Sequence, residues 1–270
     1  MDSFEIKKAN VEFHSRLASK YREQPFFRPE NLERVRSLLS SIAAETGGAR
    51  LLDIGCGTGF IFDLAYDLFT HLDGVDITPQ MLELVTARRN VRTCIASAEA
   101  LPFEDEIFDV VTMYSVLHHL PDLASALREA RRVLRPGGIL CADESPSRHY
   151  LDALSRLSGL SVLSSALIPE MDRLANDART FSELYKISPD VTRLAMVQNY
   201  YVGGLTEENL RELLASAGFS QVSIRFRRFA GEDELRRCCG ERAVSEVQYY
   251  LSSVLPISRA MFKFFELKAQ

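Results

Sequence analysis

Apolar and polar positions follow two different spacings in this chain of 270 residues. Over residues 4–45 the apolar side chains recur at helical intervals, and Pro25 and Pro29 divide the stretch into two amphipathic helices. From residue 50 to residue 142, short apolar runs alternate with helical segments. Because the connections are short, this alternation predicts a parallel, doubly wound α/β sheet with helices on both faces.

Turn residues between the apolar runs set the expected bounds of the elements. The expected strands are residues 50–54, 72–77, 92–96, 108–114, 139–142, 219–229 and 260–267. The alternation stops at residue 143 and resumes near residue 204, and the segment between them is rich in Leu, Met and Tyr. We therefore expect an N-terminal helical cap over residues 1–49. A sheet domain would comprise residues 50–143 and 204–270, with a helical lid inserted at residues 144–203.

The run at residues 51–60 joins an apolar strand to the pattern G-x-G-x-G. Glycines at the carboxyl end of a strand let the backbone approach a ligand and direct free N–H groups toward it. A dinucleotide-binding turn needs G-x-G-x-x-G, but Phe60 stands where the third glycine would be. Asp53, at the end of the strand, would repel a diphosphate and suits a cationic amine. A nicotinamide cofactor is therefore disfavoured, although the glycines alone leave it open.

Polar residues follow the ends of the neighbouring expected strands. Asp76 closes the second strand, residues 97–99 follow the third, and Tyr114 ends the fourth. Because ligands of open α/β sheets bind outside the carboxyl ends of the strands, these residues should share one rim with the glycine turn. Thr78 can cap the helix that follows, which would leave the Asp76 carboxylate for a ligand.

Further motifs follow the glycine turn in order. They are S-A-E-A-L-P-F at residues 97–103, F-D-V-V at 108–111, L-H-H-L at 117–120, R-R-V-L-R-P-G-G at 131–138 and A-G-F at 217–219. Together they resemble the class I methyltransferases that use S-adenosylmethionine (AdoMet), of the type 11/25 kind, in the branch that includes quinone-biosynthesis enzymes. The resemblance extends over about residues 13–229. It implies a Rossmann-like fold with a seven-stranded, mostly parallel sheet, and methyl transfer from AdoMet. We expect in-line displacement onto a small-molecule acceptor, which the lid residues named below suggest is apolar or aromatic.

The resemblance also assigns residues to AdoMet. Asp76 would accept from both ribose hydroxyls, Asp53 would face the ammonium group, and Ser97 stands where the family has an acid beside the adenine. The cofactor-binding residues that it implies are Asp53, Gly55, Cys56, Gly57, Asp76, Ile77, Ser97, Ala98, Glu99, Tyr114 and, from the N-terminal cap, Tyr21.

Three residues are candidates for a catalytic role. Histidine titrates near neutrality, so His119 and His149 could act as a general base, and Tyr114 would lie near the methyl group. For His119 and Tyr114, the alternative to a catalytic role is a purely structural one. The lid contributes five large side chains that suggest an acceptor pocket or, equally, packing of the lid on the core: Phe181, Tyr185, Met196, Tyr200 and Tyr201.

Composition narrows the class of protein. A net charge of −5 argues against a nucleic-acid surface, which depends on clustered Lys and Arg. No signal-peptide pattern opens the chain, and the longest mostly apolar stretch, residues 157–168, is shorter than the ~20 residues of a membrane span. Five cysteines without a C-x-x-C pair indicate free thiols. We expect a cytoplasmic protein without a bound metal, monomeric or homodimeric.

Two alternatives to a small-molecule methyltransferase remain from the sequence. One is a methyltransferase that acts on RNA or protein. A steep salt dependence of substrate binding would favour RNA. The other is a non-catalytic protein that keeps the AdoMet fold, toward which the missing acid at Ser97 points.

Overall fold

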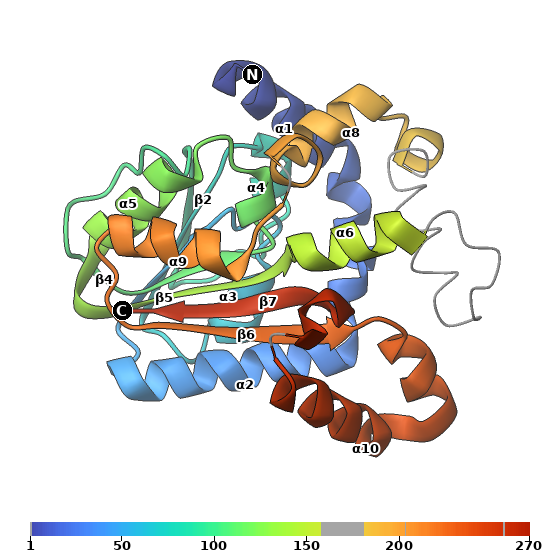
Figure 1. Ribbon diagram of the computed structural model, residues 1–270. Coiled ribbons are helices and arrows are strands. Elements are labelled where there is room, and N and C mark those ends of the chain that lie inside the picture. Colours follow the sequence, from blue (N-terminus) through green and yellow to red (C-terminus); the bar gives the residue numbers. More distant parts are fainter. Residues whose placement is uncertain (1, 158–180, 203, 256) are drawn as a thin grey trace.

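A seven-stranded sheet, in the order β3-β2-β1-β4-β5-β7-β6, forms the centre of the computed structural model. The structure describes all residues except 1, 158–180, 203 and 256 (Figure 1). The strands are β1 (Arg50–Ile54), β2 (His71–Asp76), β3 (Val91–Ile95), β4 (Phe108–Tyr114), β5 (Leu134–Pro146), β6 (Val222–Phe229) and β7 (Phe262–Ala269). β7 runs antiparallel to β5 and β6, and the other pairs are parallel. The predicted Rossmann-like, mostly parallel seven-stranded sheet is confirmed.

Helices cover both faces of this sheet (Figure 1). α5 (Leu123–Val133) and α9 (Glu207–Ser216) bury their apolar sides on one face. α2 (Pro29–Thr46) and α3 (Phe60–Ala65) do so on the other, and α10 (Glu232–Ser253) packs against β6 at the edge. α2 ends at Thr46, because Gly47 takes the left-handed conformation that stops a helix. Within the described ranges, no helix combines the length and apolar character that crossing a bilayer requires.

Three strands begin two or more residues away from the expected position. β5 begins at Leu134 because that residue pairs with Phe108, and the turn at residues 135–138 becomes an irregularity inside the strand. β6 begins at Val222 rather than residue 219, since the Phe219 N–H still donates to the Leu214 carbonyl at the end of α9. β7 begins at Phe262 because residues 257–261 form a 3-10 turn.

A cap stands over the carboxyl ends of the parallel strands. It consists of α1 (Ser3–Leu17) and α8 (Pro189–Ala195), which lie side by side although they are far apart in the sequence (Figure 1). Phe13 and Leu17 of α1 form a separate apolar cluster with Ile187 and Ala195. α6 (Arg148–Leu157) also belongs to the predicted lid, whereas residues 158–180 of that lid lie outside the described residues.

Candidate functional site

One pocket, with about 650 Å³ of empty space, opens at the carboxyl ends of β1, β2 and β4. α1 covers it, and the residues that follow β3 complete its wall. Of the residues singled out from the sequence, the pocket brings together Tyr21, Gly55, Gly57, Asp76, Ile77, Ser97, Ala98, Glu99 and His119. Four others, namely Asp53, Cys56, Tyr114 and His149, do not line it.

The glycine turn after β1 lies directly against its neighbours. Gly55 has φ +72°, and a Cβ placed there would lie 2.4 Å from Cγ2 of Val116. Gly57 has φ +51° and faces Met81. The N–H groups of Gly55 and Cys56 both donate to the carbonyl of Val75, at 2.8 and 3.0 Å. Only glycine fits at Gly55, because both the conformation and the space exclude a side chain.

Asp76, the last residue of β2, holds two backbone segments at the rim. Oδ2 accepts from Gly57 N at 2.9 Å, and Oδ1 accepts from Thr78 N at 2.8 Å. The prediction that the Thr78 side chain caps the next helix is wrong, since its hydroxyl makes no capping bond. Each carboxylate oxygen can accept more than one hydrogen bond, so Asp76 keeps acceptor capacity toward the pocket.

Three buried acceptor atoms on pocket residues have no hydrogen-bond partner within the described ranges. They are Oδ1 of Asn10, Oγ1 of Thr78 and Oε1 of Glu99. The other Glu99 oxygen is occupied, because it accepts from the Ser97 hydroxyl and pairs with Lys7 of α1 at 2.8 Å. Buried polar atoms are normally satisfied, so these three indicate a ligand with several donors.

Asp53 lies beneath the pocket instead of in its wall. Its side chain is buried, with Oδ1 accepting from the Thr112 hydroxyl at 2.7 Å. Burial raises the pKa of Asp53 to about 8, because the charged form loses its hydration. Cys56, next to the turn, is also buried. Neither side chain lines the pocket, since Asp53 at the end of β1 and Cys56 in the turn after it are both buried.

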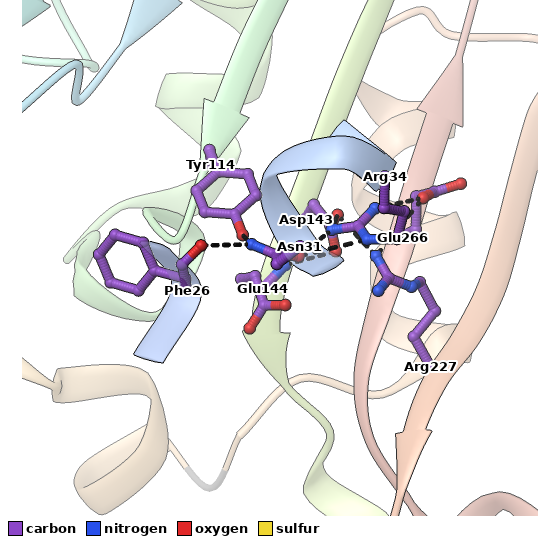
Figure 2. A network of polar contacts seen from close by, with 8 residues as sticks. All are labelled: Phe26, Asn31, Arg34, Tyr114, Asp143, Glu144, Arg227 and Glu266. Carbon is purple, nitrogen blue, oxygen red and sulfur yellow. Dashed lines mark hydrogen bonds and ion pairs between the residues drawn. The ribbon is translucent and has the colours of Figure 1, made fainter. Parts of the chain in front are cut away.

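Tyr114 belongs to a polar network at the ends of β4 and β5 (Figure 2). Its hydroxyl accepts from Asn31 Nδ2 at 2.7 Å, and its ring stacks on Phe60 with the centroids 4.5 Å apart. Asn31 also accepts from Arg34, which in turn donates to Asp143. Burial raises the pKa of Tyr114 well above its usual range, so the hydroxyl stays protonated. The network fastens the start of α2 to the sheet.

Two other candidates for a base lie away from the pocket. His149 is on α6, and its Nε2 is 3.9 Å from the Glu208 carboxylate. Glu144, in β5, is buried and has φ +55°, which is strained for a residue with a side chain. Burial, and next the charge of Asp143, raise the pKa of Glu144 to about 7. Neither residue lines the pocket beneath α1.

The pocket also contains three residues of α1 that were not predicted from the sequence: Lys7, Asn10 and His14. They come to the site only through the packing of α1 on α8 and on the strand ends. Of the lid residues expected at an acceptor pocket, Phe181, Tyr185 and Met196 pack against α1 in the cap cluster. Tyr200 and Tyr201 are exposed, and none of the five lines the pocket.

Three histidine rings meet at one end of the pocket. His14 of α1 and His119 have ring centroids 4.8 Å apart, and those of His118 and His119 are 4.0 Å apart. Burial is the largest cause that lowers the pKa of each ring, to about 3 for His118 and well below the usual value for His119. All three are therefore neutral near pH 7. Among the described residues, no group of His, Cys, Asp and Glu is arranged to hold a metal ion.

Comparisons with known proteins agree with this geometry. Residues 52–142 match a family model described as a methyltransferase domain. A ubiquinone/menaquinone biosynthesis C-methyltransferase of Shewanella frigidimarina is 30% identical over 200 residues, 67% of this chain and 70% of that one. A similar enzyme of Vibrio vulnificus is 33% identical over 190 residues, 65% of this chain and 66% of that one. A demethylmenaquinone methyltransferase of Staphylococcus aureus is 29% identical over 191 residues, 68% of this chain and 72% of that one.

Solved structures share the fold at lower identity. An S-adenosylmethionine-dependent methyltransferase from Mesorhizobium loti gives a TM-score of 0.53 at 17% identity, covering 86% of this chain and 95% of that one. Phosphoethanolamine N-methyltransferase 2 of Haemonchus contortus, in complex with S-adenosyl-L-methionine, gives 0.51 at 17% identity, covering 93% of this chain and 59% of that one.

Proposed function

Because the chain belongs to the class I AdoMet-dependent methyltransferases, in the branch of the quinone-biosynthesis enzymes, we propose that it methylates a ring carbon of a reduced, quinone-type acceptor. AdoMet supplies an electrophilic methyl group. The acceptor class is proposed from the relatives, whose printed names concern ubiquinone and menaquinone biosynthesis. A hydroquinone ring is apolar, flat and rich in electrons, as the nucleophile of such a transfer must be. A cytoplasmic location and the division into cap, sheet domain and lid remain predictions.

The pocket beneath α1 is the observation that carries the cofactor assignment. AdoMet carries an ammonium group, two ribose hydroxyls and an adenine amino group, all of which donate hydrogen bonds. The pocket offers the unpartnered oxygens of Asn10, Thr78 and Glu99, together with the remaining acceptor capacity of Asp76. The donor groups of AdoMet thus match the acceptors in the wall. We propose that Asp76 binds the ribose, that Ser97 and Glu99 face the adenine, and that the glycine turn faces the methionine end.

Asp53, Cys56 and Tyr114 take supporting roles in this proposal. Asp53 keeps β1 in place beside β4 through Thr112, and Tyr114 fastens α2 through Asn31. Tyr21 lies in the pocket wall and begins a row of aromatic rings that continues through Phe26 to Tyr114. These rings meet edge to face, with interplanar angles of 63° and 65°, and they give the pocket an apolar aromatic side at Tyr21.

Calorimetric titration with S-adenosylhomocysteine tests the cofactor site. We expect Asp76→Ala to weaken binding about ten- to a hundred-fold, since a hydrogen bond to a charged group contributes ~1.5–3 kcal/mol. Asp73→Asn is the matched control. It removes an acid from the same strand, where Asp73 pairs with Arg50 outside the pocket, and binding should stay unchanged. Equal binding by wild type and Asp76→Ala would refute the site.

Methyl transfer to a short-chain demethylmenaquinone tests the acceptor. The reduced form should be methylated, and the oxidised form should not, because its ring carbon is a poor nucleophile. Binding of S-adenosylhomocysteine without any transfer to the reduced form would refute the acceptor class. It would then favour the non-catalytic alternative or another acceptor.

A further inference from the structure

The hydrogen bond between His119 and α8 determines which ring nitrogen carries the proton. Nδ1 of His119 lies 2.7 Å from the carbonyl oxygen of Ala195. A carbonyl oxygen only accepts, so Nδ1 of the neutral ring must be the protonated nitrogen. The other nitrogen, Nε2, is then bare. Among the hydrogen bonds of the described residues, those of His119 involve its Nδ1 and its backbone groups and none involves Nε2.

The position of His119 is fixed by the cap as well as by the sheet. Its carbonyl oxygen accepts from Asn10 Nδ2 of α1 at 3.2 Å. The next carbonyl, of Leu120, accepts from Gln198 Nε2 at 2.8 Å. Three hydrogen bonds from two distant segments of the chain therefore converge on His119 and Leu120. The Ala195 carbonyl orients the ring, and the bonds from Asn10 and Gln198 hold the backbone that carries it.

On the basis of the proposed function, we infer that His119 is the proton acceptor of the methyl transfer, prepared for this role by the Ala195 carbonyl. His119 lines the pocket, and its bare Nε2 can take a proton from the acceptor. The S–CH3 bond breaks with its electron pair left on sulfur, while the new C–CH3 bond forms with a π-electron pair of the acceptor ring. The proton displaced from that carbon passes to Nε2, and the ring becomes aromatic again.

Charge supports this assignment. The transfer begins with one positive charge, on the sulfonium, and ends with one positive charge, on the His119 imidazolium, so the pocket's net charge does not change. A ring that was already protonated would repel the sulfonium. Burial lowers the pKa of His14, His118 and His119, and the three rings therefore leave the pocket free of imidazolium before the reaction. A methylated arenium carbon is so strong an acid that a weak base suffices to remove its proton.

His14 is the nearest rival and is less well placed. Its Nδ1 lies 3.0 Å from the carbonyl of Asn10, within its own helix, so that its orientation depends on α1 alone. His118 is also neutral, but it does not line the pocket. It therefore provides the matched control in the same turn of chain.

Two measurements test the inference, and the first needs no acceptor. In the complex with S-adenosylhomocysteine at pH 7.5, the ¹⁵N imidazole shifts of His119, assigned by comparison with His119→Gln, should show Nδ1 protonated and Nε2 bare. A protonated Nε2 would overturn the inference. This result is independent of the acceptor, so a failure of the proposed function is recognised separately, by absent turnover in wild type.

The second measurement is turnover of the reduced short-chain demethylmenaquinone. His119→Gln should lower kcat about 10²- to 10⁴-fold, the usual contribution of a general base, with KM and binding of S-adenosylhomocysteine nearly unchanged. His118→Gln should keep most of the wild-type kcat. Full activity of His119→Gln, or a comparable loss in His14→Gln with His119→Gln active, would overturn the inference.

Discussion

Arg34 of α2 donates from Nη2 to Oδ2 of Asp143 over 2.6 Å, across the gap between a helix and the end of β5. Arg227 of β6 approaches the same oxygen at 3.0 Å, and Arg34 also pairs with Glu266 of β7. The Asp143 side chain is only 3% exposed. The buried carboxylate of Asp143 thus joins α2 to β5 and β6, and Glu266 adds β7 through the same arginines (Figure 2).

Arg34→Gln should lower the free energy of unfolding by about 3 kcal/mol. Removing one partner of a buried ion pair leaves the other charge uncompensated, and Arg227 keeps the loss at the lower end of the usual range. Urea unfolding of wild type and Arg34→Gln measures this decrease in the free energy of unfolding. Arg36→Gln, on the same helix, breaks a more exposed pair with Asp67 and should change the free energy by less than ~1 kcal/mol. Similar losses in the two variants would contradict the structural importance of Asp143.

Asp53 should make stability depend on pH. Its pKa is raised to about 8 in the folded state, against ~3.9 in an unfolded chain. The folded state therefore binds the proton more tightly, and its stabilising contribution is complete below pH ~4 and is lost as the pH rises to about 8. Asp53→Asn cannot ionise, so its stability relative to wild type should increase from pH 5 to pH 8.5.

Urea unfolding of both proteins at several pH values provides the measurement for Asp53. Thr112→Val is a useful companion, because it removes the hydroxyl that donates to the Asp53 carboxylate. The decrease in the free energy of unfolding as the pH rises should be larger in Thr112→Val than in wild type. If the free energies of unfolding of wild type and Asp53→Asn differ by the same amount at every pH tested, Asp53 does not titrate in this pH range.

Gly55→Ala should abolish measurable binding of S-adenosylhomocysteine. The added methyl group would lie 2.4 Å from Val116, and the backbone conformation at φ +72° disfavours any side chain. Gly137→Ala has nearly the same φ, +78°, but nothing lies within 4 Å of its Cβ. It should lose only about 1 kcal/mol of stability through strain and keep normal binding. If both variants bind normally, close packing at the turn is not required.

Local features of the chain were predictable. The glycine turn, Asp76 and the acid-containing segment after β3 lie within short motifs whose backbone makes the pocket, so their positions followed from the order of strands. The mostly parallel sheet was predictable for the same reason, since strands that alternate with helices over short connections form parallel crossovers. Gly47 marked the end of α2 because a helix stop depends on one residue.

Contacts between distant segments were not predictable. His14 sits on an amphipathic helix without any motif, and only the packing of α1 on α8 brings it to His119. The orientation of Asp53 depended on a hydroxyl from β4, far away in the sequence. In each case a partner outside the local pattern decided the outcome.

The cap also has a consequence for the order of events during synthesis on the ribosome. α1 emerges first, but the apolar partners of Phe13 and Leu17 are Ile187 and Ala195, which follow only after β1 to β5 have been made. Since chains are synthesised from the N-terminus, Phe13 and Leu17 remain without these apolar partners while the strands of the sheet are made. The pocket is therefore completed late, when α8 has been synthesised and packs against α1.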